Sequence, residues 1–282
     1  MEDLCYAKAS VPRRGRLGQL TPHLTTMAAG ELNWSGDAID ALGPAGYDGV
    51  WLEGEHGPLD PGVMGDVGRA CDLWGMTAVA RVAKALDQVD ENAIYRTLDR
   101  GIQGVIVPHI NTKVEAEMVV AASKFKNEEY PMGRRGMFVS RQGFGVRDYF
   151  MQANRETMTV ILIEDIIAVQ NLAEILQVDH IDVFHVAFAD LAQSMGYLHD
   201  LGNPAVRKVT EAAIKQIVAA GRTCGTSPLN GEDLQLHHQW GARFFYTQPL
   251  TFVQQASSDF FGLVDSSSRG VRPAEASTAA KL

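Results

Sequence analysis

The sequence is poor in cysteine and has no surplus of positive charge, and each shortage argues against a class of protein. Its three cysteines, Cys5, Cys71 and Cys224, are odd in number and far apart, so they predict neither a disulfide framework nor a zinc site. We therefore expect a reducing compartment. The formal net charge of -9 argues against a nucleic-acid partner, which requires a concentrated basic surface. A small-molecule ligand is the better hypothesis.

Long apolar runs are also missing. No run approaches the roughly 20 residues that span a bilayer, and residues 1–18 lack the apolar centre of a secretion signal. We therefore expect a soluble, cytoplasmic protein with no membrane partner. The final letters AKL resemble a peroxisomal address, which leaves a peroxisomal location as the alternative, although such short matches often arise by chance.

The sequence does contain a repeated alternation of short β-rich apolar runs and longer stretches with helical periodicity. The runs are RLGQL, YDGVWLE, MTAVARV, QGVIVPH, MTVILIE, IDVFHVA, RTCGTS and ARFFYT. Several are apolar at consecutive positions, as in parallel strands that are covered on both faces. Eight such repeats predict an α/β fold, a (β/α)8 TIM barrel in a single domain over residues 1–264, with a doubly wound open sheet as the alternative.

Helices are predicted between these runs. Their ranges are Pro61 to Trp74, Val89 to Arg100, Val114 to Phe125, Ala168 to Leu176, Pro204 to Ala220 and Gly231 to Trp240. A glycine stands shortly before five of the predicted strands, where the preceding helix needs a C-terminal stop. These glycines are Gly46, Gly75, Gly101, Gly221 and Gly241.

Two segments fall outside the repeat. Residues 127–150 form a long insertion between the fourth and fifth predicted strands, and long loops in compact domains are usually functional or disordered. Residues 265–282 have no apolar face, so we predict a disordered C-terminal tail.

Polar residues directly follow the predicted strands, and a barrel carries its chemistry at that end. They are Glu53, Glu55, His56, Arg81, His109, Glu164, Asp165, Asp190 and Gln248. Glu164 and Asp190 follow neighbouring strands, whose backbones lie about 4.8 Å apart, so their carboxylates can share one ion. Two carboxylates without cysteine or a histidine cluster favour a hard cation such as Mg²⁺ or Mn²⁺. Taken singly, each acid is more often a helix N-cap or a partner in a rim salt bridge than a metal ligand.

His56 and Arg81 are candidates for proton transfer and charge stabilisation. His56 lies in a glycine-flanked turn, where it can exchange a proton near neutral pH, with Glu53 or Glu55 to orient it. The alternative is that it caps the following helix. Arg81 ends an apolar strand, where a buried guanidinium requires an anion such as an enolate; the alternative is a pair with Asp99 or Glu53.

Several segments, in order, resemble the HpcH/HpaI aldolase family, whose members are metal-dependent class II aldolases acting on pyruvate-type enolates. The segments are AGYDGVWLEGEHGPLD, VARV, LDRGIQGVIVPHINTKVEAE, YPMGRRG, ILIEDIIAVQNLAEIL and IDVFHVAFADLAQSMGY. The resemblance runs from about Gly18 to Gln254 in the family's order, and this makes it specific.

The resemblance implies a phosphoenolpyruvate/pyruvate-type barrel and a role for each matching residue. Glu164 and Asp190 would bind a divalent cation, Mg²⁺, Mn²⁺ or Co²⁺. His56 would transfer a proton, and Arg81 would stabilise the enolate oxygen. The partners implied are a keto acid and an aldehyde.

Two further roles depend on the same resemblance. Asp99 would assist the histidine of a neighbouring subunit, which is consistent with the trimers or hexamers that the family forms. The backbone N–H groups of Ala189 and Asp190 would hold the carboxylate of the keto acid. A homo-oligomer is therefore implied.

The sequence departs from the family pattern at three places. Glu53 replaces a shorter aspartate that partners the histidine, Leu162 replaces a glutamine near the keto acid, and Phe188 replaces a proline. The last two changes make the pocket less polar, and the segment FFYTQPL is more aromatic than the pattern. We therefore expect a bulky or aromatic aldehyde as the acceptor.

Three functions are compatible with these residues. The first is reversible aldol cleavage of a 2-keto acid. The second, motivated by Leu162, keeps the enolate but decarboxylates oxaloacetate or adds the enolate to another electrophile. The third is a barrel that binds a metal without catalysis, and the retention of Glu164, Asp190, His56 and Arg81 argues against it.

Overall fold

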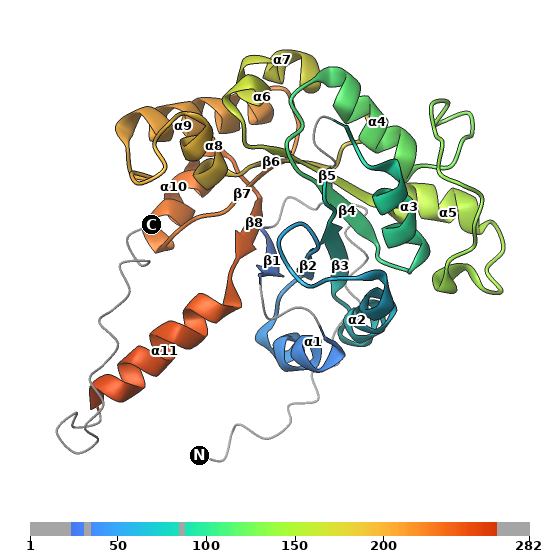
Figure 1. The fold of residues 1–282 in the computed structure, drawn as a ribbon, viewed down its shortest axis with the longest axis horizontal. Coiled ribbons are helices and arrows are strands. Elements are labelled where there is room, and N and C mark those ends of the chain that lie inside the picture. The colour runs from blue at the N-terminus through green and yellow to red at the C-terminus, as the bar shows by residue number, and fades with distance from the viewer. Residues whose placement is uncertain (1–23, 31–34, 85–87, 264–282) are drawn as a thin grey trace.

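The computed structural model describes residues 24–30, 35–84 and 88–263, which form a closed barrel of eight parallel strands surrounded by helices (Figure 1). The strands are β1 (Thr25–Ala29), β2 (Gly49–Glu53), β3 (Thr77–Arg81), β4 (Gly104–Val107), β5 (Met158–Ile163), β6 (Val183–Val186), β7 (Cys224–Thr226) and β8 (Phe244–Thr247). They follow one another around the barrel in chain order, and β1 pairs with β8. This closure confirms the (β/α)8 barrel and excludes the open sheet.

The helices lie outside the strands and run mostly where the sequence predicts them. They are α1 (Gly36–Leu42), α2 (Pro61–Trp74), α3 (Glu91–Asp99), α4 (Lys113–Ser123), α5 (Tyr149–Glu156), α6 (Ile166–Gln170), α7 (Leu172–Ile175), α8 (Phe188–Ser194), α9 (Pro204–Ala219), α10 (Gly231–Trp240) and α11 (Pro249–Leu263), with 3-10 turns η1 (Gly43–Ala45) and η2 (Arg141–Gly143). The single helix predicted from Ala168 to Leu176 is divided into α6 and α7. The five punctuating glycines all have positive φ, between 69° and 107°, as helix stops before a strand require.

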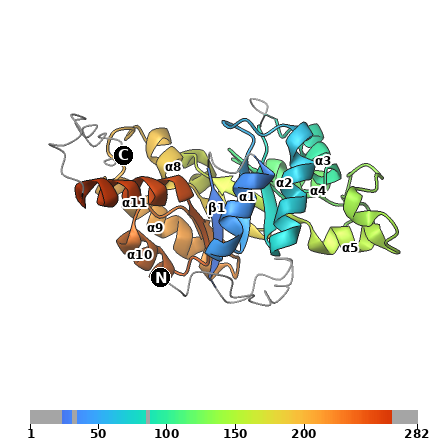
Figure 2. The ribbon, with the colours of Figure 1, turned by 90° about the horizontal axis from the view of Figure 1, so that it is seen from below.

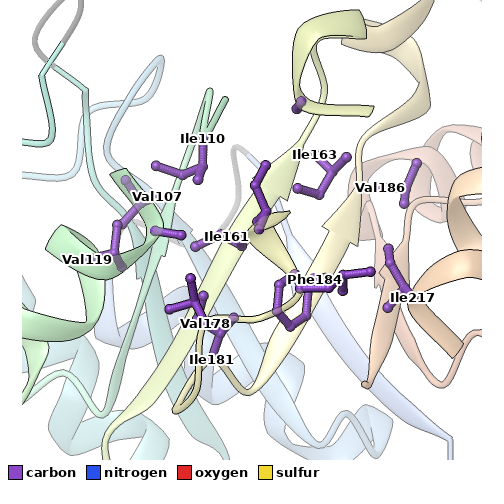
Figure 3. Packing of buried hydrophobic residues seen from close by; sticks show 14 of the residues in the cluster. Val107, Ile110, Val119, Ile161, Ile163, Val178, Ile181, Phe184, Val186 and Ile217 are labelled. Atoms are coloured by element: carbon purple, nitrogen blue, oxygen red, sulfur yellow. The ribbon is translucent and has the colours of Figure 1, made fainter. Parts of the chain in front are cut away.

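Each strand buries both faces, which explains the consecutive apolar runs. On β5, Val160 and Leu162 pack inside the barrel, whereas Ile161 and Ile163 pack against the outer helices. Figure 3 shows this outer layer, in which β-branched side chains and Phe184 fill the space between strands and helices. The alternation follows from the period of two along a strand. The barrel interior is therefore a packed core, and only its ends are available for binding.

The last helix departs from the surrounding ring. α11 follows β8 and extends away from the barrel, as Figures 1 and 2 show from two directions. All of residues 251–262 are exposed, including the apolar side chains of Phe252, Val253 and Phe260. No helix among the described residues is long and apolar enough to cross a membrane.

Some of the predicted segments lie outside the residues that the structure describes. The run RLGQL, predicted as the first strand, lies outside the described residues, and the first strand of the barrel is β1, at Thr25–Ala29. Residues 265–282 and the final AKL also lie outside, so the disordered tail and the cellular location stay predictions.

Candidate active site

The pair Glu164 and Asp190 lies at the carboxyl ends of β5 and β6. Glu164 directly follows β5, and Asp190 belongs to the first turn of α8. Glu164 is 1% exposed. This burial raises its pKa to about 7; the charge of His109 opposes the rise and that of Asp190 adds to it. Two such carboxylates repel each other unless a proton or a cation compensates their charge.

The donor set fits a hard divalent cation. Mg²⁺ is commonly held by one or two carboxylates and keeps several water ligands. In the part of the chain that the structure describes, no group of three or more His, Cys, Asp or Glu side chains is arranged to hold a metal. Glu164 and Asp190 therefore fit a cation whose other positions are filled by water and substrate, and do not fit a closed structural site.

Arg81, the last residue of β3, is held by two glutamates. Its Nε lies 3.0 and 2.8 Å from the two carboxylate oxygens of Glu53, and its Nη1 lies 2.9 Å from Glu55 Oε2. Burial alone would lower the pKa of Arg81, but the hydrogen bond and charge of Glu53 outweigh it and raise the pKa. The pair with Glu53, left open by the sequence, is therefore present. The positive charge of Arg81 nevertheless reaches Glu164, where it opposes the rise in pKa that burial causes.

His56 is exposed, with 74% of its side chain accessible. Glu53 Oε1 accepts hydrogen bonds from the backbone N–H groups of Glu55 and His56, at 2.8 and 3.0 Å, and so shapes the turn. The carboxylate beside the imidazole is that of Glu55, whose Oε2 lies 3.7 Å from Nε2. Of the two acids considered for orienting His56, the structure places Glu55 there.

His109, which follows β4, contacts the acidic pair directly. Its backbone N–H donates to Glu164 Oε1 at 2.7 Å, and its Nδ1 lies 3.0 Å from Asp165 Oδ2 and 3.4 Å from Glu164 Oε1. Burial lowers the pKa of His109, but the charges of Glu164, Asp165 and Glu55 together raise it above its ordinary value. His109 is also one of three residues other than glycine with positive φ in the described part of the chain, and its φ is 52°.

The floor below this rim is largely apolar and aromatic. Leu162 lies inside the barrel in register with His185 of β6. His185 is 1% exposed, its Nε2 lies 2.9 Å from Ser227 Oγ, and burial together with Arg81 lowers its pKa to about 3. The rings of Trp51 and Tyr246 approach it at centroid distances of 5.1 and 6.4 Å. An uncharged surface thus closes the barrel beneath the acids.

The start of α8 presents the residues assigned to carboxylate binding. Phe188 is the first helical residue and is buried, with its ring 6.4 Å from that of His237. Ala189 and Asp190 follow and are exposed. N–H groups in the first turn of a helix have no partner within the helix, so these two can face an anion.

Asp99 is the one predicted site residue that lies apart from the others in this chain. It ends α3, at the opposite end of the barrel, before β4 begins. Its carboxylate contacts Arg135 Nη2 at 3.3 Å, and burial raises its pKa while Arg135 opposes the rise. Its assignment depends on a neighbouring subunit.

The structure shows that Glu55, His109 and Asp165 contact one another or the other residues of the site. All three follow strands in the sequence, so their positions near the rim were foreseeable. Their contacts were not, because the ring of His109 could have turned toward solvent.

The sequence profile of the HpcH/HpaI aldolase/citrate lyase family matches residues 35–244. The 2-keto-3-deoxy-L-rhamnonate aldolase of Salmonella schwarzengrund (strain CVM19633) is 31% identical over 205 residues, which cover 71% of this chain and 73% of that protein. The enzyme of the same name from Salmonella typhimurium has the same identity and coverage.

Solved structures agree in fold. An HpcH/HpaI aldolase/citrate lyase family protein from Burkholderia cenocepacia J2315 superposes with a TM-score of 0.80 at 25% identity, covering 88% of this chain and 97% of its own. Macrophomate synthase superposes with a TM-score of 0.67 at 19% identity, covering 86% of each chain, and this likeness concerns the fold alone.

Proposed function

The chain belongs to the HpcH/HpaI aldolase/citrate lyase family and is an aldolase-type carbon–carbon lyase, and from this premise we propose that it requires a divalent cation and acts on the enolate of a pyruvate-type 2-keto acid and an aldehyde. The observation that carries the proposal is the buried Glu164 beside Asp190, two acids close enough to influence each other at the mouth of a barrel. Mg²⁺, Mn²⁺ and Co²⁺ are the candidates.

The residues of the rim bind the cation, bind the carboxylate of the substrate and stabilise the negative charge of the enolate. Glu164 and Asp190 hold the cation, which when bound polarises the carbonyl of the keto acid as a Lewis acid. The N–H groups of Ala189 and Asp190 bind the carboxylate of the keto acid. Arg81, already charged and anchored by Glu53, adds positive potential where negative charge develops on the enolate oxygen.

The acceptor side is proposed to be apolar and wide enough for a bulky or aromatic aldehyde. Leu162 and Phe188 are buried where the family pattern has polar or smaller groups, and Tyr246 lies at the mouth, with its hydroxyl accepting a hydrogen bond from Gln248 at 2.9 Å. 2-Keto-3-deoxy-L-rhamnonate, the substrate in the name of the similar Salmonella enzymes, is the first compound to test.

A homo-oligomer, a trimer or a hexamer, is part of the proposal. Its support is α11, which extends from the barrel with exposed apolar side chains. Apolar surface of this kind usually marks a protein interface. The site of Asp99, away from its own rim, is also consistent with a role across subunits.

The test separates enolisation from cleavage. Metal-stripped protein is incubated with pyruvate in deuterated buffer, and exchange at C3 is followed by NMR with and without Mg²⁺, Mn²⁺ or Co²⁺. We expect metal-dependent exchange that Glu164→Ala and Asp190→Ala abolish while the circular dichroism spectrum is unchanged. Glu117→Ala, at an exposed position of α4, is the control and should behave as wild type. Undiminished exchange in the Glu164 or Asp190 variant would refute the ligand assignment.

A second candidate is decarboxylation of oxaloacetate, favoured by Leu162, whose apolar side chain replaces an amide near the keto acid. This reaction needs the same enolate. Release of CO₂ from oxaloacetate, without cleavage or synthesis of any aldol, would favour it over the aldolase.

A further inference from the structure

His109 adopts a backbone conformation that only its surroundings can maintain. A non-glycine residue with a φ of 52° is in the left-handed region, which costs roughly 1 kcal/mol or more. Three contacts hold it there: the N–H group donates to Glu164 Oε1, the carbonyl accepts from Lys84 Nζ at 2.6 Å, and the ring contacts Asp165. Such strain, kept by specific contacts, is typical of functional sites.

These contacts also determine which ring nitrogen is available. The nearest neighbour of Nδ1 is Asp165 Oδ2, at 3.0 Å, and a carboxylate oxygen only accepts hydrogen bonds, so Nδ1 carries a hydrogen. Nε2 points elsewhere: it lies 3.9 Å from Glu55 Oε1, beyond hydrogen-bonding distance. The side chain is 44% exposed. An imidazole that is fixed at Nδ1 and accessible at Nε2 is arranged to hydrogen-bond a ligand.

The order of the strands puts His109 on the acceptor side of the proposed substrate. β6, β5 and β4 are neighbours in that order around the barrel. In the proposed binding mode the carboxylate of the keto acid lies at the start of α8, after β6, and its carbonyl lies near Glu164, after β5. The third carbon of the keto acid then points toward β4. The new carbon–carbon bond forms at that carbon. His109 is the first polar residue after β4.

We propose that His109, held through Nδ1 by Asp165, is a substrate-binding residue whose Nε2 accepts a hydrogen bond from the C4 hydroxyl of the aldol in the cleavage direction. This inference rests on the proposed function and adds a residue to it; the histidine that the sequence predicted for proton transfer is His56. His56 is mostly exposed and lies 3.7 Å from a single carboxylate, whereas His109 is anchored from three sides.

Three variants and one control test whether His109 contacts the substrate. His109→Asn retains a polar atom near the position of Nδ1, tolerates positive φ, and removes Nε2. His109→Gln places its amide near the position of Nε2. The control is His180→Asn, because among the described residues His180 is the other histidine with positive φ, at 66°, and its ring contacts that of Tyr130 before β6, away from the site. His56→Asn tests the competing assignment.

Four quantities are measured for each variant: Mn²⁺ affinity by calorimetry, the melting temperature, C3 exchange of pyruvate, and aldol turnover. Turnover is assayed as cleavage of 2-keto-3-deoxy-L-rhamnonate and as synthesis from pyruvate with short hydroxyaldehydes and aromatic aldehydes. For His109→Asn we expect Mn²⁺ affinity and exchange within about twofold of wild type, an equal or higher melting temperature, and a kcat/KM for turnover about 10- to 100-fold lower. His109→Gln should recover part of the loss, and His180→Asn should show none.

Three results would overturn the inference. The first is normal turnover in His109→Asn, with the loss appearing in His56→Asn instead. The second is an equal loss of exchange and turnover, which would mean that His109 serves the cation or the donor. The third is exchange by wild type without turnover of any aldehyde, since no acceptor would then exist. Absence of exchange in wild type with every metal would instead remove the proposed function, and this inference with it.

Discussion

At the scale of single residues, His185 is an ionisable side chain of the barrel interior that cannot be charged without loss of stability. His185 lies in the interior between aromatic rings, and burial lowers its pKa to about 3. The unfolded chain has an ordinary histidine, with a pKa of about 6.5. Between these values the unfolded state binds the additional proton, so the contribution of His185 to stability is lost progressively as the pH falls below about 6.5.

We therefore expect His185→Gln, which stays neutral, to flatten the acid side of the stability curve. Below pH 6.5 the free energy of unfolding of wild type should fall relative to the variant by about 1.4 kcal/mol per pH unit. Urea titrations of metal-free protein between pH 4.5 and 8 measure this difference. His238→Gln, at an exposed position, should run parallel to wild type. Parallel curves for His185→Gln would mean that water or motion lets the buried ring take up a proton.

The sequence predicted residue positions at the rim better than residue contacts. Glu164, Asp190 and Arg81 were placed from strand ends alone, because parallel strands end at one edge. The pairing of Arg81 with Glu53 rather than Asp99 depends on the strand register, in which Glu53 and Arg81 are direct neighbours. The partners of His109 depend on a rotamer and a left-handed backbone, and composition and periodicity carry no information about either.

At the scale of elements, the loop from β4 to α4 determines how His109 is held. Thr112 and Glu115 form a capping box at the start of α4. Glu115 also accepts hydrogen bonds from the N–H of Asn111 at 2.8 Å and from Lys84 Nζ at 2.5 Å. Lys84 in turn contacts the carbonyl of His109. One carboxylate therefore links the helix start to the strained residue of the site.

Glu115→Gln should lower the free energy of unfolding by about 1 to 3 kcal/mol at neutral pH, because it removes a charge-assisted bond to a buried lysine and weakens the cap. Burial raises the pKa of Glu115, but the bonds from Lys84 and Asn111 outweigh it and lower the pKa. The stabilisation is therefore present above the ordinary range of a glutamate and is lost as the pH falls. Thermal melts at pH 7 and pH 4 measure it, and the difference between variant and wild type should shrink at pH 4.

The matched control is Glu117→Gln, which removes a charge from an exposed position of the same helix and should change the melting temperature little. If the two variants behaved alike, the carboxylate of Glu115 would contribute only its general charge to α4. The link from the helix start to His109 would then not contribute to stability.

Elements with caps and strong periodicity were predictable, and those fixed by tertiary contacts were not. α2 and α10 begin and end where predicted, since Asp60 and Asn230 cap their first turns and Gly75 and Gly241 end them. α6, α7 and α8 are too short to show a period. β1 carries TTMAA, a sequence too weakly apolar to stand out, and it is a strand because β2 and β8 pair with it on both sides.

At the scale of the whole molecule, α11 is the feature that a single barrel does not explain. Phe252, Val253 and Phe260 are between 53% and 60% exposed on one helix that leaves the barrel. Burying one such side chain stabilises a protein by roughly 1.5 to 3 kcal/mol. A monomer in which these side chains stay exposed lacks this stabilisation. The periodicity of α11 gave no indication of where it packs, because amphipathic helices look alike whether their partner is the same chain or another copy.

We expect the wild-type protein to be a trimer or hexamer and the double substitution Phe252→Ser with Phe260→Ser to shift it to smaller species. Light scattering coupled to size exclusion at micromolar concentration gives the mass directly. Leu73→Ser, at an apolar position of α2 that is 76% exposed, is the control for the loss of surface apolarity and should leave the mass unchanged. If Asp99 acts across subunits, the smaller species should also lose turnover while retaining the far-ultraviolet spectrum of a folded barrel. A wild-type protein that is already monomeric, and fully active as a monomer, would contradict both the oligomer and the role of Asp99.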